Sequence, residues 1–384
     1  MTTRNYSIFL NPNILVSLAF LSVLILYLFQ WSDLLLPLHP GLVSFLVLFI
    51  FANFFWGLAC QCSGVYKYVS IDSPKKNKSM FILGIGGILF SAIYGYIATL
   101  HVIIVAFSSF LAILACNNYL LARRKRKRWL LLHLVLLALI FFVIGHRIFL
   151  FFILLAVFLL IVQNKMNDMK KLRIRNVLSF LCLGLAILFV FGFVGNRIRS
   201  EIFHAGDLIL VIGEANERFT ESGIPNEFFW AYIYATSPMA NLNLNIRLNN
   251  REGYSIRNFY IFIISTFFPD FLSRRILSPE IYFESRRGKQ INDILNVFSI
   301  FLVPYRYFSW VGMFITFLFI TFFPFVYFSI IRNTPNFLIY LVVFNIIYVF
   351  LVFDNLLAFS GLSFMLFFPL LGIIFRSKYL KYQG

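Results

Sequence analysis

Long uninterrupted apolar runs are the feature that most limits what this chain can fold into. A helix that crosses a bilayer core needs roughly 20 consecutive apolar residues, and runs near that length recur along the chain. They lie near 14–30, 41–59, 80–97, 101–121, 129–145, 149–163, 176–194, 307–331, 336–353 and 355–375. Continuous rather than alternating apolar character predicts helices and not barrel strands. We therefore expect an all-α polytopic membrane protein of about ten transmembrane helices, forming one integral membrane domain over residues 1–384.

Composition supports the same fold class. Hydrophobic residues make up 61% of the chain and charged residues only 12%, more apolar surface than a soluble core of this size buries. The net charge of +18 would suggest nucleic acid for a soluble protein, but here basic residues flank the apolar runs, so no nucleic-acid partner is expected. The four cysteines, Cys60, Cys62, Cys116 and Cys182, lie in or beside those runs. They form no set of metal ligands, and we predict neither a metal nor a cofactor.

The distribution of lysine and arginine predicts the orientation. Basic clusters follow the second, fourth and sixth runs and the last one, at 67–78, 123–128, 165–175 and 376–381. The alternate loops, around 34–40 and at His101, carry no lysine or arginine. Because basic loops stay in the cytoplasm, both termini are predicted to be cytoplasmic. The cluster at 123–128 has a second interpretation, recognition of an anionic membrane lipid.

Parity then places residues 195–306 outside the cytoplasm as one large loop segment. This segment contains 11 of the 21 arginines but only one of the 12 lysines, alongside 11 acidic residues. A guanidinium offers a planar fork for phosphate, pyrophosphate or carboxylate, which a lysine does not match. The arginines are therefore candidates for anion binding, and the alternative is that they pair with the local acidic residues.

Within the loop, residues 258–272 are apolar but interrupted by Pro269 and Asp270. This stretch is short for a crossing, so we predict a re-entrant or interfacial element. The alternative is an eleventh span paired with a twelfth near 294–304. An enzyme acting on a lipid-linked substrate needs polar residues at this depth.

Motifs that are missing exclude several reaction classes. The chain has no P-loop, GxSxG, HExxH or GxGxxG motif and no DxD pair in a suitable context, which argues against ATPases, serine hydrolases, zinc proteases and metal-dependent nucleotide-sugar transferases. A lipid pyrophosphate is a donor that needs no nucleotide site, because arginines alone can stabilise its departure.

Candidate residues follow from that chemistry. The arginines are Arg147, which lies between two apolar runs, Arg197, Arg199, and those of the stretches 247–257, which includes Arg251 and Arg257, and 274–287. The candidates for a general base are His204, Glu201, Asp207, Glu214, Glu217 and Asp270. Asp354 lies between the last two runs and is predicted to mark a turn.

Four segments carry a resemblance to a known family. They are GHR ending at Arg147, GNRIRSEIF from Gly195, FWAYIYATSPMANL from Phe229 and NVFSIFLVPYRYFSWVGMF from Asn296. Together they resemble the bacterial O-antigen and capsule repeat-unit polymerases of the Wzy type. The resemblance covers about the last two thirds of the chain, and its motifs are loose because this family shares topology more than sequence.

The resemblance implies an architecture like that of C-type glycosyltransferases and O-antigen ligases, with a large periplasmic loop. It implies that Arg147, Arg197 and Arg199 hold the pyrophosphate. Tyr234, Pro238 and Asn241 form a family-like loop motif, and Gly312 matches a glycine that opens the next helix. The chain departs from the family at 307–310, where Tyr-Phe-Ser-Trp replaces an Asp-Phe-Gly-like run.

The function implied is polymerisation of oligosaccharide repeat units carried on undecaprenyl pyrophosphate, at the periplasmic face of the bacterial inner membrane. The expected partners are the lipid-linked oligosaccharide, membrane lipid and a chain-length regulator protein. Two alternatives stay open: an O-antigen ligase, for which His204 would serve, and a flippase or transporter of lipid-linked sugars. A membrane acyltransferase would need a buried His or His-Asp pair, which the sequence does not show. Internal repeats and mid-membrane charges, which a transporter would show, are not evident in the sequence.

Overall fold

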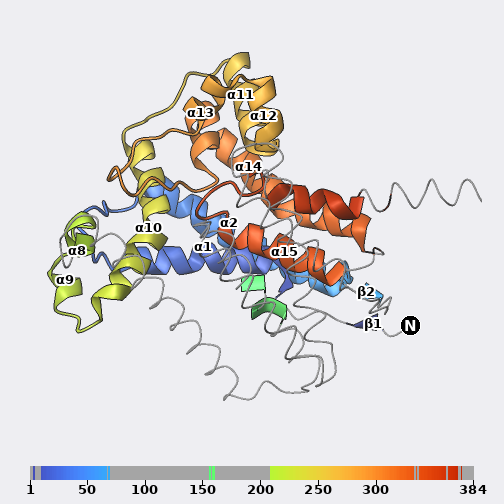
Figure 1. The fold of residues 1–384 in the computed structure, drawn as a ribbon, viewed down its shortest axis with the longest axis horizontal. Helices are drawn as coiled ribbons and strands as arrows, with labels where there is room; N and C mark the ends of the chain where they lie inside the picture. Colours follow the sequence, from blue (N-terminus) through green and yellow to red (C-terminus); the bar gives the residue numbers. More distant parts are fainter. Residues whose placement is uncertain are drawn as a thin grey trace, which may run out of the picture.

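The computed structural model describes residues 3–4, 10–66, 68–69, 155–156, 158–160, 208–332, 334, 337–359, 362–370 and 373. The described part is mostly helical, and its two strands, β1 (Thr3–Arg4) and β2 (Tyr68–Val69), are a short antiparallel pair. Figure 1 shows four helices running side by side: α1 (Pro12–Leu28), α2 (Pro40–Ser63), α14 (Leu302–Ile331) and α15 (Phe337–Phe350). Three shorter helices are grouped beside the start of α14: α11 (Ile256–Phe267), α12 (Asp270–Ile276) and α13 (Pro279–Ser285). The predicted spans at 80–97, 101–121, 129–145 and 176–194 lie outside the described residues.

The helices α1 (Pro12–Leu28) and α2 (Pro40–Ser63) form an antiparallel pair near the predicted positions. Both begin with proline at the first helical position, where the missing N–H has no intrahelical acceptor in any case. The side chain of Asn11 caps α1, and Gly64 ends α2 in the left-handed conformation. Polar caps therefore define where these apolar runs become helical.

Buried asparagines cross-link the apolar helices. The Asn13 amide donates to Asn53 Oδ1 at 3.0 Å and to the Thr321 carbonyl at 2.9 Å, which joins α1 to α2 and to α14. Asn345 of α15 donates to the Leu10 carbonyl at 2.8 Å. Since unpaired polar groups are costly in an apolar interior, these bonds fix how the helices register against one another.

Two of the described helices, α2 and α14 (Leu302–Ile331), are long and apolar enough to cross a membrane, judged by length and composition. The helices α1, α11 and α15 (Phe337–Phe350) are apolar but shorter. Less than half of the most apolar stretch of α2 and of α14 is buried. Large apolar side chains are exposed along both, among them Phe51, Phe55, Phe322 and Ile330.

The helix α14 is interrupted near its start. Phe308 and Ser309 have non-helical backbone angles, and Ser309 has a φ of 52°, which side-chain-bearing residues adopt rarely. Arg251 donates to the Ser309 hydroxyl at 3.0 Å, and the Glu252 N–H donates to the Arg306 carbonyl at 2.6 Å. The loop at 251–252 thus contacts the interruption from outside the helix.

The helices α8 (Leu208–Ile212), α9 (Glu217–Thr220) and α10 (Asn226–Arg247) pack against the loop that joins α1 to α2. Ser32 donates to the Gly213 carbonyl at 2.5 Å, and the Trp31 N–H donates to the Tyr232 hydroxyl at 2.9 Å. Arg247 donates to the Pro37 carbonyl. Two segments that the charge pattern predicts to lie outside the cytoplasm are therefore in direct contact.

The stretch predicted to be re-entrant forms two helices with a break between them. These are α11 (Ile256–Phe267) and α12 (Asp270–Ile276), and Pro269 separates them. At 1.5 Å per residue the 12 residues of α11 extend about 18 Å, short of a bilayer core of about 30 Å. The alternative pairs an eleventh span here with a twelfth at 294–304, but residues 291–301 form bends, turns and irregular chain, and helix begins only at Leu302.

The last predicted run begins later than expected. The chain turns from 351 to 358, and helix is next observed at 362–370 instead of from 355. The prediction that Asp354 marks a turn is confirmed: its N–H donates to the Phe350 carbonyl, and its carboxylate accepts from the Asn355 N–H at 2.6 Å. Asp354 and Asn355 thus lie in a turn after the end of α15, and this turn contacts α11 and α12.

Candidate functional site

Asp270 is the first residue of α12 and the centre of the candidate site. Pro269 before it cannot continue α11, because proline has no N–H and restricts the residue before it. The Asp270 N–H donates to the Ala358 carbonyl at 2.7 Å, and the side chain is buried with 6% exposure. The break between two short helices therefore places a carboxyl group in the interior of the loop segment.

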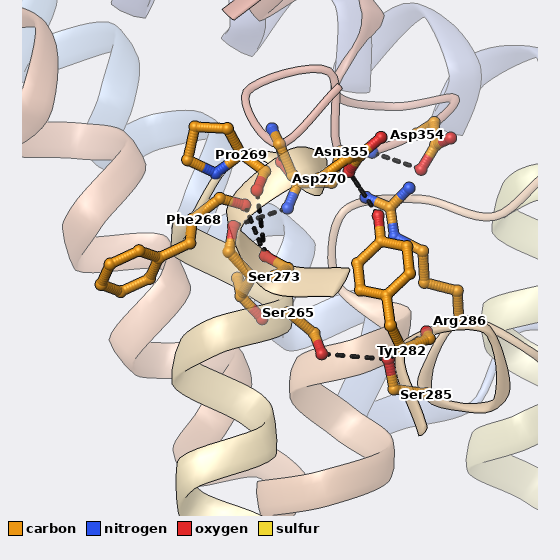
Figure 2. Close-up of polar contacts among 12 residues, drawn as sticks. Ser265, Phe268, Pro269, Asp270, Ser273, Tyr282, Ser285, Arg286, Asp354 and Asn355 are labelled. Carbon is orange, nitrogen blue, oxygen red and sulfur yellow. Dashed lines mark hydrogen bonds and ion pairs between the residues drawn. The ribbon is translucent and has the colours of Figure 1, made fainter. Parts of the chain in front are cut away.

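Two side chains of one helical face meet this carboxyl group. The hydroxyl of Tyr282, in α13 (Pro279–Ser285), donates to Asp270 Oδ1, and Arg286 Nη2 lies 3.7 Å from the same oxygen. Tyr282 and Arg286 are four residues apart, the spacing that brings side chains together on a helix. Figure 2 shows the Arg286 guanidinium beside the Tyr282 hydroxyl, with Asp354 close by.

Burial decides the protonation of this cluster. Desolvation raises the pKa of Asp270 above its ordinary value, although Arg286 and the Tyr282 hydroxyl act in the lowering direction. Burial also lowers the pKa of Arg286, but Asp354, Asp270 and Tyr282 more than offset this effect, and the net direction is upward. The site therefore combines a permanently charged guanidinium with a carboxylate that is a stronger base than an exposed aspartate.

Arg286 has hydrogen-bonding capacity that the protein does not use. Its Nε and Nη2 atoms are buried and have no hydrogen-bond partner among the described residues, and the 3.7 Å to Asp270 is too long for one. The side chain as a whole is 21% exposed. Buried donors without partners are costly, and an anionic oxygen beside the guanidinium would satisfy them.

The surrounding polar groups hold these elements in place. Ser265 of α11 and Ser285 of α13 share a hydrogen bond of 3.0 Å, and both are buried. The Ser273 hydroxyl bonds to carbonyls at the end of α11, and Asn355 donates to the Thr266 carbonyl at 2.6 Å. As Figure 2 shows, α11, α12, α13 and the turn after α15 all contribute to one connected network.

Aromatic rings extend the cluster toward the surface. The Arg274 guanidinium lies 5.4 Å from the ring centre of Tyr282 and 4.8 Å from that of Phe283, and Arg286 lies 5.3 Å from Tyr282. These distances are within the range of cation–π contact. Arg274 and Arg286 therefore both contact the ring of Tyr282, whose hydroxyl bonds to the buried carboxyl group.

Of the residues predicted from sequence, Asp270 is in the cluster. Arg251 contacts the interruption of α14, and Arg257 is exposed at the start of α11. Arg147, Arg197, Arg199, Glu201 and His204 lie outside the described residues. The pyrophosphate and base roles assigned to those five residues stay predictions.

Tyr234 and Asn241 lie in α10, a helix, although a loop motif was expected here; that part of the expectation is wrong. The ring of Tyr234 lies 4.9 Å from that of Trp230. Asn241 is fully buried: it donates to the Leu295 and Val297 carbonyls at 2.7 and 2.8 Å and accepts from the Ile291 N–H at 2.8 Å. Their predicted contact with substrate stays untested, and these bonds account for Asn241 structurally.

Pro238 is also inside α10, and Ser237 compensates for it. Proline cannot donate to the carbonyl four residues before it, which is that of Tyr234, and the Ser237 hydroxyl donates to this carbonyl at 3.2 Å. A helix with an interior proline is therefore maintained by the neighbouring serine.

Sequence reasoning did not single out Tyr282, Arg286 and Asp354 as site residues. Arg286 was one member of an arginine-rich stretch, and its spacing of four from Tyr282 was the available signal. No cluster of three or more histidine, cysteine or acidic side chains able to hold a metal occurs among the residues that the structure describes. No family model, no curated protein and no solved structure matches this chain.

Proposed function

We propose that this protein is a glycosyltransferase of the polysaccharide polymerase type, which joins oligosaccharide repeat units carried on undecaprenyl pyrophosphate. The observation that carries the proposal is Arg286, a buried cation with unused donors beside a carboxyl group of raised pKa. Such a pair fits a reaction in which an anionic group departs while a hydroxyl loses its proton. The sequence resemblance to the Wzy-type family supports the same reaction.

The proposed location is the bacterial inner membrane, with about ten spans, both termini in the cytoplasm and residues 195–306 in the periplasm. Two long apolar helices with exposed apolar side chains support membrane insertion. Hydrogen bonds between the 29–39 loop and α8 to α10 support the prediction that these segments share one side. The broken pair α11 and α12 then lies near the depth of a lipid headgroup.

The reaction is a single displacement with inversion. The hydroxyl oxygen of an acceptor unit forms a bond to the anomeric carbon of the donor chain, while the bond from that carbon to the pyrophosphate oxygen breaks. The pyrophosphate leaves with the bonding electron pair, and Arg286 with Arg274 stabilises its developing charge. Asp270 accepts the hydroxyl proton, because its raised pKa makes it a stronger base than an exposed aspartate.

The test is the ladder of surface polysaccharide on a gel, from cells that lack this gene and are complemented with variants. We expect deletion to leave lipid core bearing one repeat unit, and Arg286→Ala and Asp270→Asn to fail to restore the ladder at normal expression. The matched control is Arg275→Ala, an exposed arginine of α12, which should restore it.

Three other outcomes contradict the proposal. Long chains that accumulate on the carrier lipid would identify a ligase instead. An unchanged ladder after deletion would exclude both enzymes and favour transport of lipid-linked sugars. A ladder restored by Arg286→Ala would show that the Asp270 cluster serves folding alone.

A further inference from the structure

The short helix α13 presents two different faces. Tyr282 and Arg286 point to Asp270, whereas Glu280, Phe283 and Glu284 line a pocket of about 640 Å³ together with Arg287. Glu280, Phe283 and Glu284 are spaced by three and four, so they lie on one side of α13, and Arg287 follows the end of the helix. The other lining residues are Asn250, Gly288, Lys289 and Arg306. The pocket is therefore separate from the carboxyl cluster but built on the same helix.

Arg306 gives the pocket a cationic wall. This residue is only 9% exposed, and its Nη1 atom donates to the carbonyls of Glu284 and Arg287 at the end of α13. Its Nη2 lies 3.7 Å from Glu252 Oε1, and its Nε is buried with no hydrogen-bond partner among the described residues. A fixed guanidinium with an unused donor therefore borders the pocket.

The lining mixes hydrogen-bond donors with acceptors. Arg287, Lys289 and Arg306 are donors only, Glu280 and Glu284 in their ionised form are acceptors only, and Asn250 is both. A phosphate group would meet two carboxylates here, and a cationic ligand would meet three positive side chains. A hydroxyl group donates and accepts at once, so a ligand rich in hydroxyl groups satisfies both kinds of side chain.

Phe283 adds an apolar surface to this lining. Its side chain is 48% exposed, and Arg274 lies over the ring at 4.8 Å from its centre. Sugar rings combine hydroxyl groups with an apolar face of C–H groups, and an exposed aromatic ring can pack against such a face. The volume also lies within the range of small-molecule sites, roughly 300–1,000 Å³.

We infer that this pocket binds a saccharide, and that the saccharide is the sugar portion of the acceptor unit. The inference rests on the proposed function, in which the acceptor must present a hydroxyl close to the donor pyrophosphate. The glutamates accept hydrogen bonds from its hydroxyl groups, the cations and Asn250 donate to them, and Phe283 packs against the ring. The opposite face of α13 carries Arg286, so one helix would position both reactants.

The experiment measures saccharide binding to the purified full-length protein in detergent micelles. The probe is the lipid-free repeat unit, released by mild acid hydrolysis of the glycosyl pyrophosphate bond in the lipid-linked repeat units of the host. We expect Glu284→Gln and Phe283→Ala each to weaken binding at least about tenfold, because each removes a contact with the saccharide. Both side chains are exposed, so the variants should fold normally. Arg286→Gln, on the other face, should leave this affinity within about twofold of wild type.

A second readout separates this inference from the proposed function. The same variants are assayed for chain extension on lipid-linked repeat units, where the pocket variants should raise KM for the acceptor and Arg286→Gln should lower kcat. If wild type extends chains but the pocket variants keep wild-type affinity and KM, the pocket inference is wrong and the proposed function stands. If wild type binds the saccharide in this pocket but extends no chain, the proposed function is wrong. If wild type does not bind the saccharide, the inference is overturned.

Discussion

The hydroxyl of Tyr282 donates a hydrogen bond to Asp270 Oδ1, which ties α13 to the first residue of α12. Both residues belong to the loop segment, and both are buried. A buried carboxylate needs partners, and here the phenol of Tyr282 donates a hydrogen bond while the Arg286 guanidinium provides an opposite charge at 3.7 Å. The hydrogen bond between Tyr282 and Asp270 therefore helps to hold α13 against α12.

Tyr282→Phe should destabilise the protein by about 1.5–3 kcal/mol, because a hydrogen bond to a charged group is lost while the ring packing remains. Thermal denaturation of the purified protein in detergent micelles measures the change. The matched control, Tyr260→Phe, alters a ring that is 48% exposed and should change stability by less than about 0.5 kcal/mol. Equal melting temperatures for both variants would contradict the structural role of the bond.

Asp270 should make stability depend on pH in the direction opposite to an ordinary salt-bridged aspartate. Because burial raises the pKa of Asp270, the folded protein retains a proton that the unfolded chain loses above about pH 4. The stabilisation of the folded state by protonated Asp270 is therefore fully present below about pH 4. It is lost as the pH rises through the pKa of Asp270 in the folded protein. Melting temperatures of wild type and Asp270→Asn should be measured from acid to neutral pH. As the pH rises, the melting temperature of wild type should fall relative to that of the variant. Parallel curves or the reverse slope would contradict this pKa direction.

Asn241→Ala should loosen the segment that follows α13. The variant leaves the Leu295 and Val297 carbonyls and the Ile291 N–H without their partner, at a cost of at least about 2 kcal/mol. Hydrogen exchange followed by mass spectrometry should become faster at 289–297. The control Asn258→Ala removes an exposed hydrogen bond to the Gly253 carbonyl and should leave exchange at 289–297 unchanged. Unaltered exchange in Asn241→Ala would mean that these bonds do not hold the segment.

Gly312→Ala should strain the start of α14. A Cβ atom at this position would overlap the Pro304 carbonyl oxygen and lie 2.9 Å from Phe308 Cβ. Overpacking of this kind typically costs about 1–3 kcal/mol, so we expect a lower melting temperature and reduced accumulation in cells. Gly253→Ala is the control, because nothing lies within 4 Å of an added Cβ there. A variant at Gly312 as stable as this control would show that the interruption of α14 adapts freely.

Most of the described apolar helices could be predicted from the sequence, because a helix that is removed from water needs a long run of apolar residues. Besides the late start of the last run, the start of α14 differs from the prediction: it begins at Leu302, five residues before the predicted 307, since Tyr305 and Arg306 interrupt the apolar run. The non-helical backbone at Ser309 also has no sequence signal, because it depends on Arg251 and Glu252 packing against it.

The candidate site could be predicted only in part for a related reason. Asp270 is conspicuous in sequence because a carboxylate beside a proline interrupts an apolar stretch. Arg286 is less conspicuous, since only its spacing of four from Tyr282 distinguishes it from the neighbouring Arg287. In the structure Arg286 points to Asp270 and Arg287 lines the pocket. Asp354 joins the cluster through the fold, because the turn after α15 contacts α11 and α12.

Because α13 carries functional side chains on two sides, the number of residues in this helix is constrained. Each residue of a helix is rotated by about 100° from the one before it, so inserting or deleting a single residue before Tyr282 would turn Arg286 away from Asp270. The same shift would carry Glu284 out of the pocket. Substitutions would then damage one face at a time, whereas a one-residue change in length would damage both together. Relatives of this chain should therefore keep the number of residues in Pro279–Ser285.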